Sequence, residues 1–151
     1  MKTIASFTVD HDKLEPGIYI SRIDGDVTTF DLRTRKPNAG EYMDTITMHS
    51  VEHMLATLLR NSEIGSQIIY FGPMGCRTGF YLVMFGDLAS EDVLETVLDM
   101  CEFIVGFEGS IPGAQPAECG NYSEQNLNMA KYYISRYKKD LTEKRNLHYG
   151  E

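Results

Sequence analysis

Two histidines and a glutamate stand close together in the stretch His49-Ser-Val-Glu52-His53. Successive residues of a helix are about 100° apart, so these three side chains would project from one face of a helix. Two imidazoles placed in this way can share one metal ion, and Glu52 can then act beside that ion as a general base or acid. The alternative for this spacing is a helix whose histidines only face solvent or the core.

A tetrahedral metal site needs a further protein ligand, and Cys119 is the best candidate in the sequence. It lies near the end of the stretch from Ser110 to Gly120, whose prolines and glycines favour a loop over a helix or a central strand. One thiolate with two neutral imidazoles suits Zn(II) or Fe(II) and leaves a fourth position open, which indicates catalysis. The alternative is an ordinary loop cysteine.

The other two cysteines have different surroundings. Cys101 falls on the apolar stripe of an expected helix, so we expect a small buried residue with no chemical role. Cys76 lies in the glycine-rich segment from Gly72 to Gly79, where Arg77 can favour its thiolate. It is therefore a candidate acid/base group or nucleophile, and the alternative is a structural cysteine in a turn. Three cysteines cannot all pair within the chain, which argues against a disulfide framework.

The elements that must position these residues follow from the pattern of apolar residues. The alternating runs from Gly17 to Asp24 and from Asp26 to Leu32 predict a hairpin that turns at Gly25. The runs from Ser66 to Phe71 and from Phe80 to Phe85 predict two strands around the glycine-rich segment. Three helices are expected: roughly from Thr47 to Arg60, from a cap formed by Ser90 with Glu91 and Asp92 to Gly106, and from Ser123 through Leu141.

Length, composition and charge restrict the class of protein. A chain of 151 residues with 42% apolar residues predicts one domain, spanning residues 1–151, with a continuous core. The net charge of -8 repels phosphate backbones and anionic lipids, so neither nucleic acid nor a membrane surface is an expected partner. No apolar run reaches the roughly 18 residues of a membrane span. Met1 to Asp12 also lacks the pattern of a signal peptide, and we therefore expect a cytoplasmic protein.

Five short stretches, spread over nearly the whole chain, carry the most specific pattern. They are Ser6-Phe7-Thr8-Val9-Asp10-His11; Phe30-Asp31-Leu32-Arg33 with Pro37-Asn38; His49-Ser-Val-Glu52-His53; Pro73-Met74-Gly75-Cys76-Arg77-Thr78-Gly79-Phe80-Tyr81; and Ile111-Pro112-Gly113-Ala114 leading to Glu118-Cys119-Gly120-Asn121-Tyr122. In this order they resemble the S-ribosylhomocysteine lyase family, whose product is the precursor of autoinducer-2, a quorum-sensing signal.

The resemblance implies a fold and the central residues of a site. The fold would be α+β, a single domain with an antiparallel sheet and helices packed against it. His49, His53 and Cys119 match the ligands of one divalent metal per chain, with Fe(II) as the expected native ion and Zn(II) as a common occupant. Glu52 and Cys76 match the acid/base pair. The reaction would be cleavage of S-ribosylhomocysteine into homocysteine and 4,5-dihydroxy-2,3-pentanedione, by metal-assisted carbonyl migration and β-elimination.

The resemblance also implies a substrate pocket at the interface of a homodimer. Ser6, His11 and Arg33 match residues that line this pocket in the family. By pattern alone His11 is a surface histidine, and Arg33 is a solvated or salt-bridged residue at a strand end. The chain departs from the commoner family sequence at Tyr70-Phe71-Gly72, where Asp-Ile-Ser precedes Pro-Met-Gly-Cys. The family's acidic residue helps to hold the amino-acid end of the substrate.

Two other functions are compatible with part of the pattern. A small metallopeptidase can carry HxxEH as an inverted zinc motif, with Glu52 as the base for a metal-bound water. That interpretation gives Cys76 no role. A metal-buffering module would need four protein ligands in a closed site, and Cys76 is the only plausible fourth ligand in the sequence.

Overall fold

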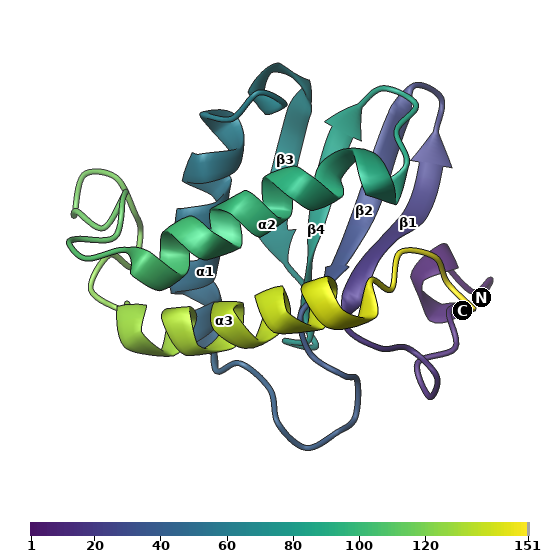
Figure 1. Cartoon of the computed structure of the whole chain (residues 1–151), viewed down its shortest axis with the longest axis horizontal. Coiled ribbons are helices and arrows are strands. Elements are labelled where there is room, and N and C mark those ends of the chain that lie inside the picture. The colour runs from purple at the N-terminus through teal and green to yellow at the C-terminus, as the bar shows by residue number, and fades with distance from the viewer. Residues whose placement is uncertain (151) are drawn as a thin grey trace.

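Four strands form one antiparallel sheet in the order β1-β2-β4-β3 (Figure 1). β1 (Gly17–Asp24) and β2 (Val27–Arg33) form the expected hairpin, and Gly25 in its turn has a φ of 60°, which favours glycine. β4 (Gly79–Phe85) pairs with β2 on one side and with β3 (Ile68–Pro73) on the other. This computed structural model describes residues 1–150. All four predicted strands are confirmed: β1 has the predicted ends, and the ends of the other three are shifted by at most two residues.

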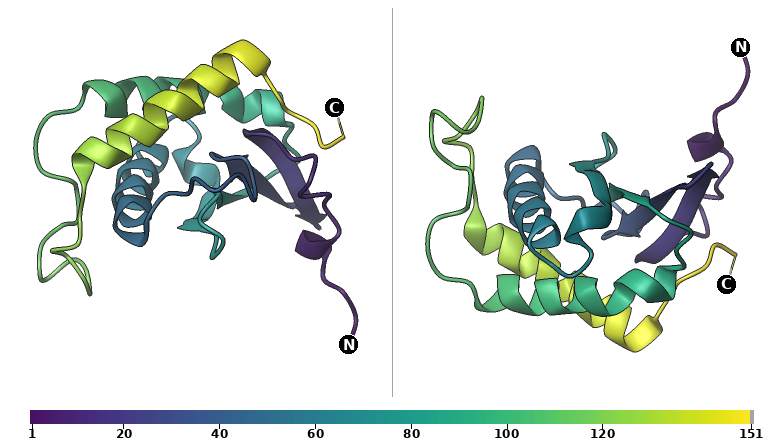
Figure 2. Two further views of the ribbon diagram at one scale, coloured as in Figure 1. Left: turned by 90° about the horizontal axis from the view of Figure 1, so that it is seen from below. Right: turned by 90° about the horizontal axis from the view of Figure 1, so that it is seen from above.

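Three long helices and two short 3-10 turns complete the fold. α2 (Ser90–Gly106) and α3 (Leu127–Lys144) pack together across one face of the sheet, and α1 (Thr45–Arg60) packs beside β3 (Figures 1 and 2). The 3-10 turns are η1 (Ala5–Phe7) and η2 (Gly65–Gln67). The expected α+β architecture, with helices packed on an antiparallel sheet, is confirmed. Within residues 1–150, no helix is both long enough and apolar enough to cross a bilayer.

The cap of α2 agrees with the prediction at Asp92 and differs from it at Ser90. The residue at the N-cap is Ala89, and its backbone N–H donates to the carboxylate of Asp92 at 2.7 Å. Ser90, the expected cap, is the first residue of the helix, and its buried hydroxyl has no hydrogen-bond partner within residues 1–150. The acidic residue of the first turn therefore caps this helix in place of the serine.

The start of α3 also differs, because the helix begins at Leu127 and not at Ser123. Asn126 is its N-cap, and the Asn126 side chain accepts a hydrogen bond from the backbone N–H of Met129. The residues just before the helix are engaged elsewhere. Gln125 and the backbone of Asn126 form hydrogen bonds with the side chain of Ser50, so this segment connects the start of α3 to α1.

The core lies between the sheet and the helices because the strands alternate. In β4, Phe80, Leu82 and Met84 point toward the helices and are fully buried. Their partners include Ile18, Phe30 and Leu32 from β1 and β2, Val51, Met54 and Leu55 from α1, Val97 and Ile104 from α2, and Ile134 and Tyr137 from α3. This core fixes α1, which carries the histidines, against the sheet, whose turn carries Cys76.

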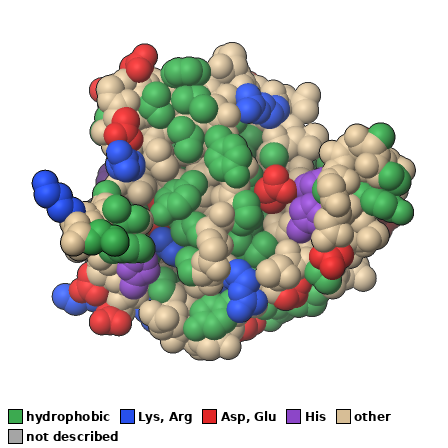
Figure 3. Space-filling model, turned by 180° about the vertical axis from the view of Figure 1, so that it is seen from behind, with side chains coloured by type: hydrophobic (Ala, Val, Ile, Leu, Met, Phe, Trp, Pro, Cys, Tyr) green, Lys and Arg blue, Asp and Glu red, His purple; other side chains and the backbone are tan. Residues whose placement is uncertain are grey.

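The other face of the sheet bears no helix (Figure 2). Along β4, Tyr81 and Val83 are half-buried and Phe85 is exposed, in alternation with the core residues. Tyr70 pairs with Val83 in the neighbouring strand and is also exposed. Figure 3 views the molecule from behind and shows hydrophobic side chains gathered over this face. We call it the open face.

Candidate active site

α1 holds both histidines on a rigid support. Asp44 caps the helix, since its carboxylate accepts hydrogen bonds from the backbone N–H and the hydroxyl of Thr47, both at 2.8 Å. Burial alone would raise the pKa of Asp44, but the bonds from Thr47 hold that pKa below its usual value. Val51 and Leu55 on the buried face anchor the helix in the core. The start of α1 is therefore well defined where the motif begins.

The two imidazole rings are oriented by backbone carbonyls of distant segments. Nδ1 of His49 lies 2.9 Å from the carbonyl oxygen of Glu124, and Nδ1 of His53 lies 2.8 Å from that of Pro112. A carbonyl oxygen only accepts, so each Nδ1 carries the proton and each Nε2 keeps its lone pair. This is the arrangement that orients a histidine as a metal ligand through Nε2.

Cys119 meets the two rings at the same place. Its Sγ lies 3.4 Å from Nε2 of His49, and the ligand atoms of His49, His53 and Cys119 all lie within 4.8 Å of one another. Within residues 1–150 this is the only group of three or more His, Cys, Asp or Glu side chains placed to hold a metal ion. The structure thus brings together the three side chains predicted as ligands, although Cys119 is seventy residues from His49.

The segment that carries Cys119 is fixed to α1 by contacts that the sequence did not predict. Gly113 has a φ of 73°, and a Cβ built on it would lie 3.0 Å from Nδ1 of His53, so only glycine lets the backbone approach this ring. On the other side, the hydroxyl of Ser50 donates to the side chain of Gln125 at 2.7 Å. The backbone acceptors Pro112 and Glu124 left no signal in the sequence, because every residue has a carbonyl.

Glu52 stands beside the group without belonging to it. Its Oε2 lies 3.7 Å from Nε2 of His53, and its side chain is about a third exposed. A carboxylate next to a possible metal site, but outside the ligand set, can reach a proton on a molecule bound there. This is the position that the helical spacing predicted.

Cys76 lies in the turn between β3 and β4 and is exposed. Its Sγ is 3.1 Å from the hydroxyl of Thr78 and 3.8 Å from a guanidinium nitrogen of Arg33. The sequence suggested Arg77 as the cation beside this thiol, and that expectation is wrong. Arg77 has a φ of 63° and donates to the carbonyl of Met43, so its guanidinium ties the turn to the residue before the cap of α1.

Arg33 is almost fully buried, with 3% of its surface exposed. It donates to the carboxylate of Asp31 at 2.7 Å and to the hydroxyl of Thr78 at 2.8 Å, which leaves its cationic head directed at the Cys76 turn. Of the two pattern-based alternatives for Arg33, the salt-bridged one is confirmed. Asp31 and Thr78 were not singled out from the sequence, although both lie within the quoted stretches.

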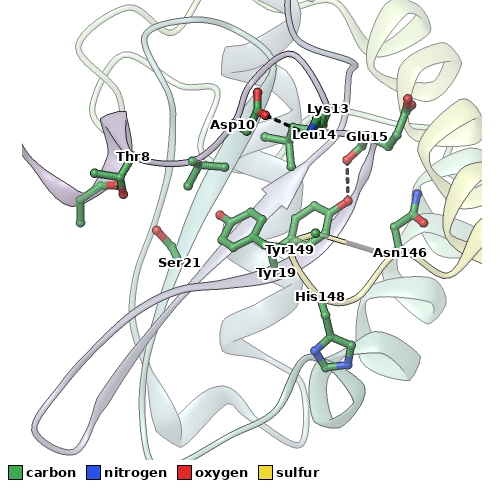
Figure 4. Close-up of a pocket in the computed structure, with 13 residues that line it drawn as sticks. Thr8, Asp10, Lys13, Leu14, Glu15, Tyr19, Ser21, Asn146, His148 and Tyr149 are labelled. Atoms are coloured by element: carbon green, nitrogen blue, oxygen red, sulfur yellow. Dashed lines mark hydrogen bonds and ion pairs between the residues drawn. The ribbon is translucent and has the colours of Figure 1, made fainter.

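Ser6 and His11 lie on the N-terminal segment, which runs beside β1 at the opposite end of the molecule from the Cys119 loop (Figure 1). His11 is half-buried, and its Nδ1 contacts the carbonyl of Val9 at 2.8 Å. Next to this segment is a pocket of about 510 Å³ (Figure 4). Its walls come from residues 5–21 and 146–150. A single chain therefore does not bring Ser6 and His11 to the metal-binding group.

The departure from the family sequence has a visible structural effect. Tyr70 is 58% exposed on the open face, and its ring covers the position where a side chain at Gly72 would lie. Phe71 points the other way and stacks on Phe80 in the core. The tyrosine and the glycine therefore fit each other sterically. The phenol offers no fixed negative charge at this position.

The fold and the site together define a class, a single-domain α+β protein with one potential metal centre of two imidazoles and a thiolate. A carboxylate and a second cysteine stand outside the ligand set. Residues 4–147 match the sequence profile of the S-ribosylhomocysteinase (LuxS) family, and the chain belongs to this family. The matched range includes the HxxEH motif of α1, the cysteines Cys76 and Cys119, and Arg33.

Relatives with the name S-ribosylhomocysteine lyase are similar along almost their whole length. The protein of Finegoldia magna is 49% identical over 157 aligned positions, which cover all of both chains. That of Borreliella burgdorferi is 52% identical over 91% of this chain and 90% of its own. That of Clostridium beijerinckii is 48% identical over 93% and 92%. The chain is thus similar to these lyases over at least nine tenths of its own length and of theirs.

These findings decide between the functions that the sequence allowed. The family is one of lyases, so the metallopeptidase interpretation of HxxEH loses its support. A metal-buffering module would need a fourth protein ligand. Within residues 1–150, the metal-binding group has three members, and Cys76 is not among them.

Proposed function

We propose that this protein is a metal-dependent carbon-sulfur lyase that cleaves S-ribosylhomocysteine into homocysteine and 4,5-dihydroxy-2,3-pentanedione. The observation that carries the proposal is the convergence of His49, His53 and Cys119 in a chain about 50% identical to proteins of that name. The whole chain, residues 1–151, would act as one catalytic domain. Glu52 and Cys76 would serve as the acid/base pair.

The three ligand side chains fit a divalent ion. Both Nδ1 atoms are engaged with carbonyls, which leaves the Nε2 atoms as the ring nitrogens that would bind an ion. A thiolate with two imidazoles suits Fe(II) or Zn(II), and we propose Fe(II) as the native ion and Zn(II) as an alternative occupant. When bound, such an ion supplies a Lewis acid for a carbonyl or hydroxyl oxygen of the sugar and eases removal of the neighbouring proton.

The protein's own task in this reaction is to move protons along the open-chain sugar. A base removes the proton from the carbon next to the carbonyl and returns it to the former carbonyl carbon. The hydroxyl proton passes to the former carbonyl oxygen, so the carbonyl moves by one position. Two such transfers bring it to C3 without net oxidation or reduction. Glu52, beside the ligand group, and Cys76, next to the cationic Arg33, would make these transfers.

The last step separates the two products. Removal of the proton from C4 drives out the homocysteine sulfur from C5, because the new double bond is conjugated with the carbonyl at C3. The sulfur leaves as a thiolate and takes up one proton. The enol that remains at C4 passes its hydroxyl proton to C5 and becomes the diketone, so atoms and charge balance. The buried guanidinium of Arg33 lies 3.8 Å from the Cys76 sulfur, so Arg33 would line the substrate pocket beside the proposed acid/base cysteine.

We also propose that the protein works as a homodimer with its substrate site at the subunit interface. The open face of the sheet supports this, since Tyr70 and Phe85 are more than half exposed there. Ser6 and His11 would bind substrate from a segment that lies far from the metal-binding group of their own chain. A partner subunit could bring its copy of this segment to that group.

A cytoplasmic location and a place in homocysteine metabolism complete the proposal. All three cysteines are free, as in a reducing compartment. The small sugar thioether that we propose as substrate would be formed inside the cell. The pentanedione product is the precursor of autoinducer-2, so a role in quorum sensing would follow alongside recovery of homocysteine in the activated methyl cycle.

The direct test is release of free thiol from S-ribosylhomocysteine by protein purified without oxygen, together with metal analysis. We expect one divalent ion per chain and a thiol-release rate that depends on it. A protein that holds its metal in full and releases no thiol would contradict the proposed reaction.

The dimer is tested by mixing chains that carry His11→Ala with chains that carry Cys76→Ala. If each site takes residues from both subunits, the hybrid contains one intact site and regains part of the activity. If each site belongs to one chain, every site keeps one defect and the mixture stays inactive. Sedimentation of the unmodified protein checks that the dimer forms.

A further inference from the structure

A line of hydrogen bonds connects the C-terminal segment with the Cys76 thiol. The phenol of Tyr149 donates to Oδ2 of Asp31 at 2.7 Å, and Arg33 donates to the same oxygen, also at 2.7 Å. The other end of the Arg33 guanidinium lies 3.8 Å from Sγ of Cys76. The buried carboxylate of Asp31 therefore connects Tyr149, in the C-terminal segment, with the guanidinium of Arg33 beside Cys76.

The charges in this line have few other partners. The side chains of Asp31 and Arg33 are 2% and 4% exposed. Within residues 1–150, Oδ1 of Asp31 and Nε of Arg33 have no hydrogen-bond partner. Burial is the largest single influence on the pKa of Arg33 and lowers it. The charge and the hydrogen bond of Asp31, together with the nearby Cys76 and Tyr149, raise this pKa by more in sum, so the guanidinium stays charged. Because these groups are shielded from water, their electrostatic interactions are only weakly screened. A change in charge or hydrogen bonding at one group therefore alters the energy of the next.

The tail is placed for this contact by its own packing. Leu147 is buried in the core, and the carbonyl of Asn146 accepts a hydrogen bond from the backbone of Ile18 in β1. Tyr149 then lies flat on Tyr19, with ring centroids 4.6 Å apart and an angle of 13° between the planes (Figure 4). Burial, and then the charge of Asp31, raise the pKa of Tyr149, so its hydroxyl remains a donor at neutral pH.

We propose that Tyr149 is a positioning residue that acts through Asp31 and sets how much of the Arg33 charge is available to Cys76. Asp31 and the Cys76 thiolate compete for one guanidinium. The phenol satisfies part of the carboxylate's hydrogen-bonding capacity, which weakens its hold on Arg33 and leaves more positive charge for the thiolate. The inference rests on the proposed acid/base role of Cys76, and it adds the C-terminal tail to the elements that support it.

The test removes one oxygen atom. Tyr149→Phe keeps the ring stacked on Tyr19 and deletes only the donor to Asp31. Tyr132→Phe is the matched control, because its hydroxyl lies on the exposed side of α3 and bonds to Arg136. The measurement is the rate at which iodoacetamide alkylates Cys76 at pH 7, followed by mass on the peptide that contains it. We expect a fall on the order of fivefold for Tyr149→Phe and no change for Tyr132→Phe.

A second variant separates this role from simple anchoring of the tail. Asp31→Asn removes the competing charge, so the Cys76 alkylation rate should rise or hold, and Tyr149→Phe should cause no further fall in that background. Equal alkylation rates in the unmodified and Tyr149→Phe proteins would overturn the inference. It would also be overturned if Tyr149→Phe slowed alkylation as much in the Asp31→Asn protein as in the unmodified protein. Thermal unfolding of each variant checks that the fold is kept.

Alkylation does not require turnover, which keeps this inference separate from the proposed reaction. If Tyr149→Phe slows alkylation but leaves thiol release unchanged, the positioning by Tyr149 stands and the role of Cys76 in the reaction fails. If both rates fall together, with KM for S-ribosylhomocysteine unchanged, both ideas are supported.

Discussion

The two halves of the candidate site are built in different ways. The metal-binding half takes its histidines from one helix and holds them with backbone carbonyls of Pro112 and Glu124. The Cys76 half depends on side chains of the sheet, above all the buried pair of Asp31 and Arg33. The first half needs the backbone of a distant loop in one place, and the second needs particular residues at particular positions in the sheet register.

This difference predicts how each half fails. A change in the metal-binding half should appear as lost metal, because geometry at the ion is what those contacts maintain. A change in the Cys76 half should leave the metal in place and alter proton transfer or thiol reactivity. The comparison would fail if changes near Cys76 removed the metal, or if changes at the metal ligands left the metal in place.

The largest effect is expected for Cys119→Ala. Removal of the thiolate leaves two imidazoles, so the protein should lose most of its metal and its thiol-release activity by on the order of 10³-fold, since Lewis-acid assistance is worth several kcal/mol. Metal analysis and thiol release measure the two losses. Cys101→Ala is the control, and it should keep both metal and activity. A Cys119→Ala protein with full metal content would refute this ligand assignment.

Cys76→Ala should show the opposite combination, with metal retained and activity lost. The expected fall in kcat is about 10² to 10⁴-fold, the usual contribution of a positioned acid/base group. Loss of the ion in this variant would instead favour Cys76 as a fourth ligand and a closed site. Normal thiol release would show that Cys76 takes no part in proton transfer.

The sequence predicted the metal-binding half well because its information is local. The spacing of His49 and His53 places both rings on one helix face whatever the rest of the fold does. Cys119 required a further step, which succeeded because few other residues in the chain can supply a soft third ligand. The carbonyl acceptors could not be predicted, since backbone groups leave no mark on the sequence.

The sequence predicted less of the Cys76 half because its contacts depend on register. Arg77 is adjacent to Cys76 and seemed the natural cation, but its left-handed backbone turns its side chain toward Met43. Arg33 reaches the turn instead because it pairs with Gly79 across β2 and β4. That pairing, and the return of Tyr149 to the sheet, are long-range features that periodicity does not reveal.

A smaller effect is expected for Gly113→Ala. The added Cβ would press on Nδ1 of His53 from 3.0 Å, in a backbone conformation that costs roughly 1–2 kcal/mol for an L residue. Metal affinity should fall about tenfold, as for other losses of a ligand's supporting contact. Gly106→Ala is the matched control, because a Cβ there meets nothing within 4 Å. Equal metal affinity in the two variants would mean that the Pro112 carbonyl does not hold His53.

The smallest effect concerns Cys101, the thiol with no proposed role. Burial raises its pKa from 9.0 to about 12, so the folded protein keeps this proton while the unfolded chain loses it above pH 9. Stability should therefore fall as the pH rises from 9 toward 12. At pH 10, Cys101 should lower the free energy of unfolding by about 1.4 kcal/mol relative to pH 8. Denaturant unfolding of the unmodified protein and of Cys101→Ala at both pH values measures this difference.

The loop between α2 and α3 has an evolutionary consequence. Surface loops ordinarily accept insertions and deletions, but this one must present the Pro112 carbonyl, the Cys119 sulfur and the Glu124 carbonyl to one helix at the same time. A single residue added between any two of them would displace at least one contact. Its length should therefore be inherited as strictly as that of a strand.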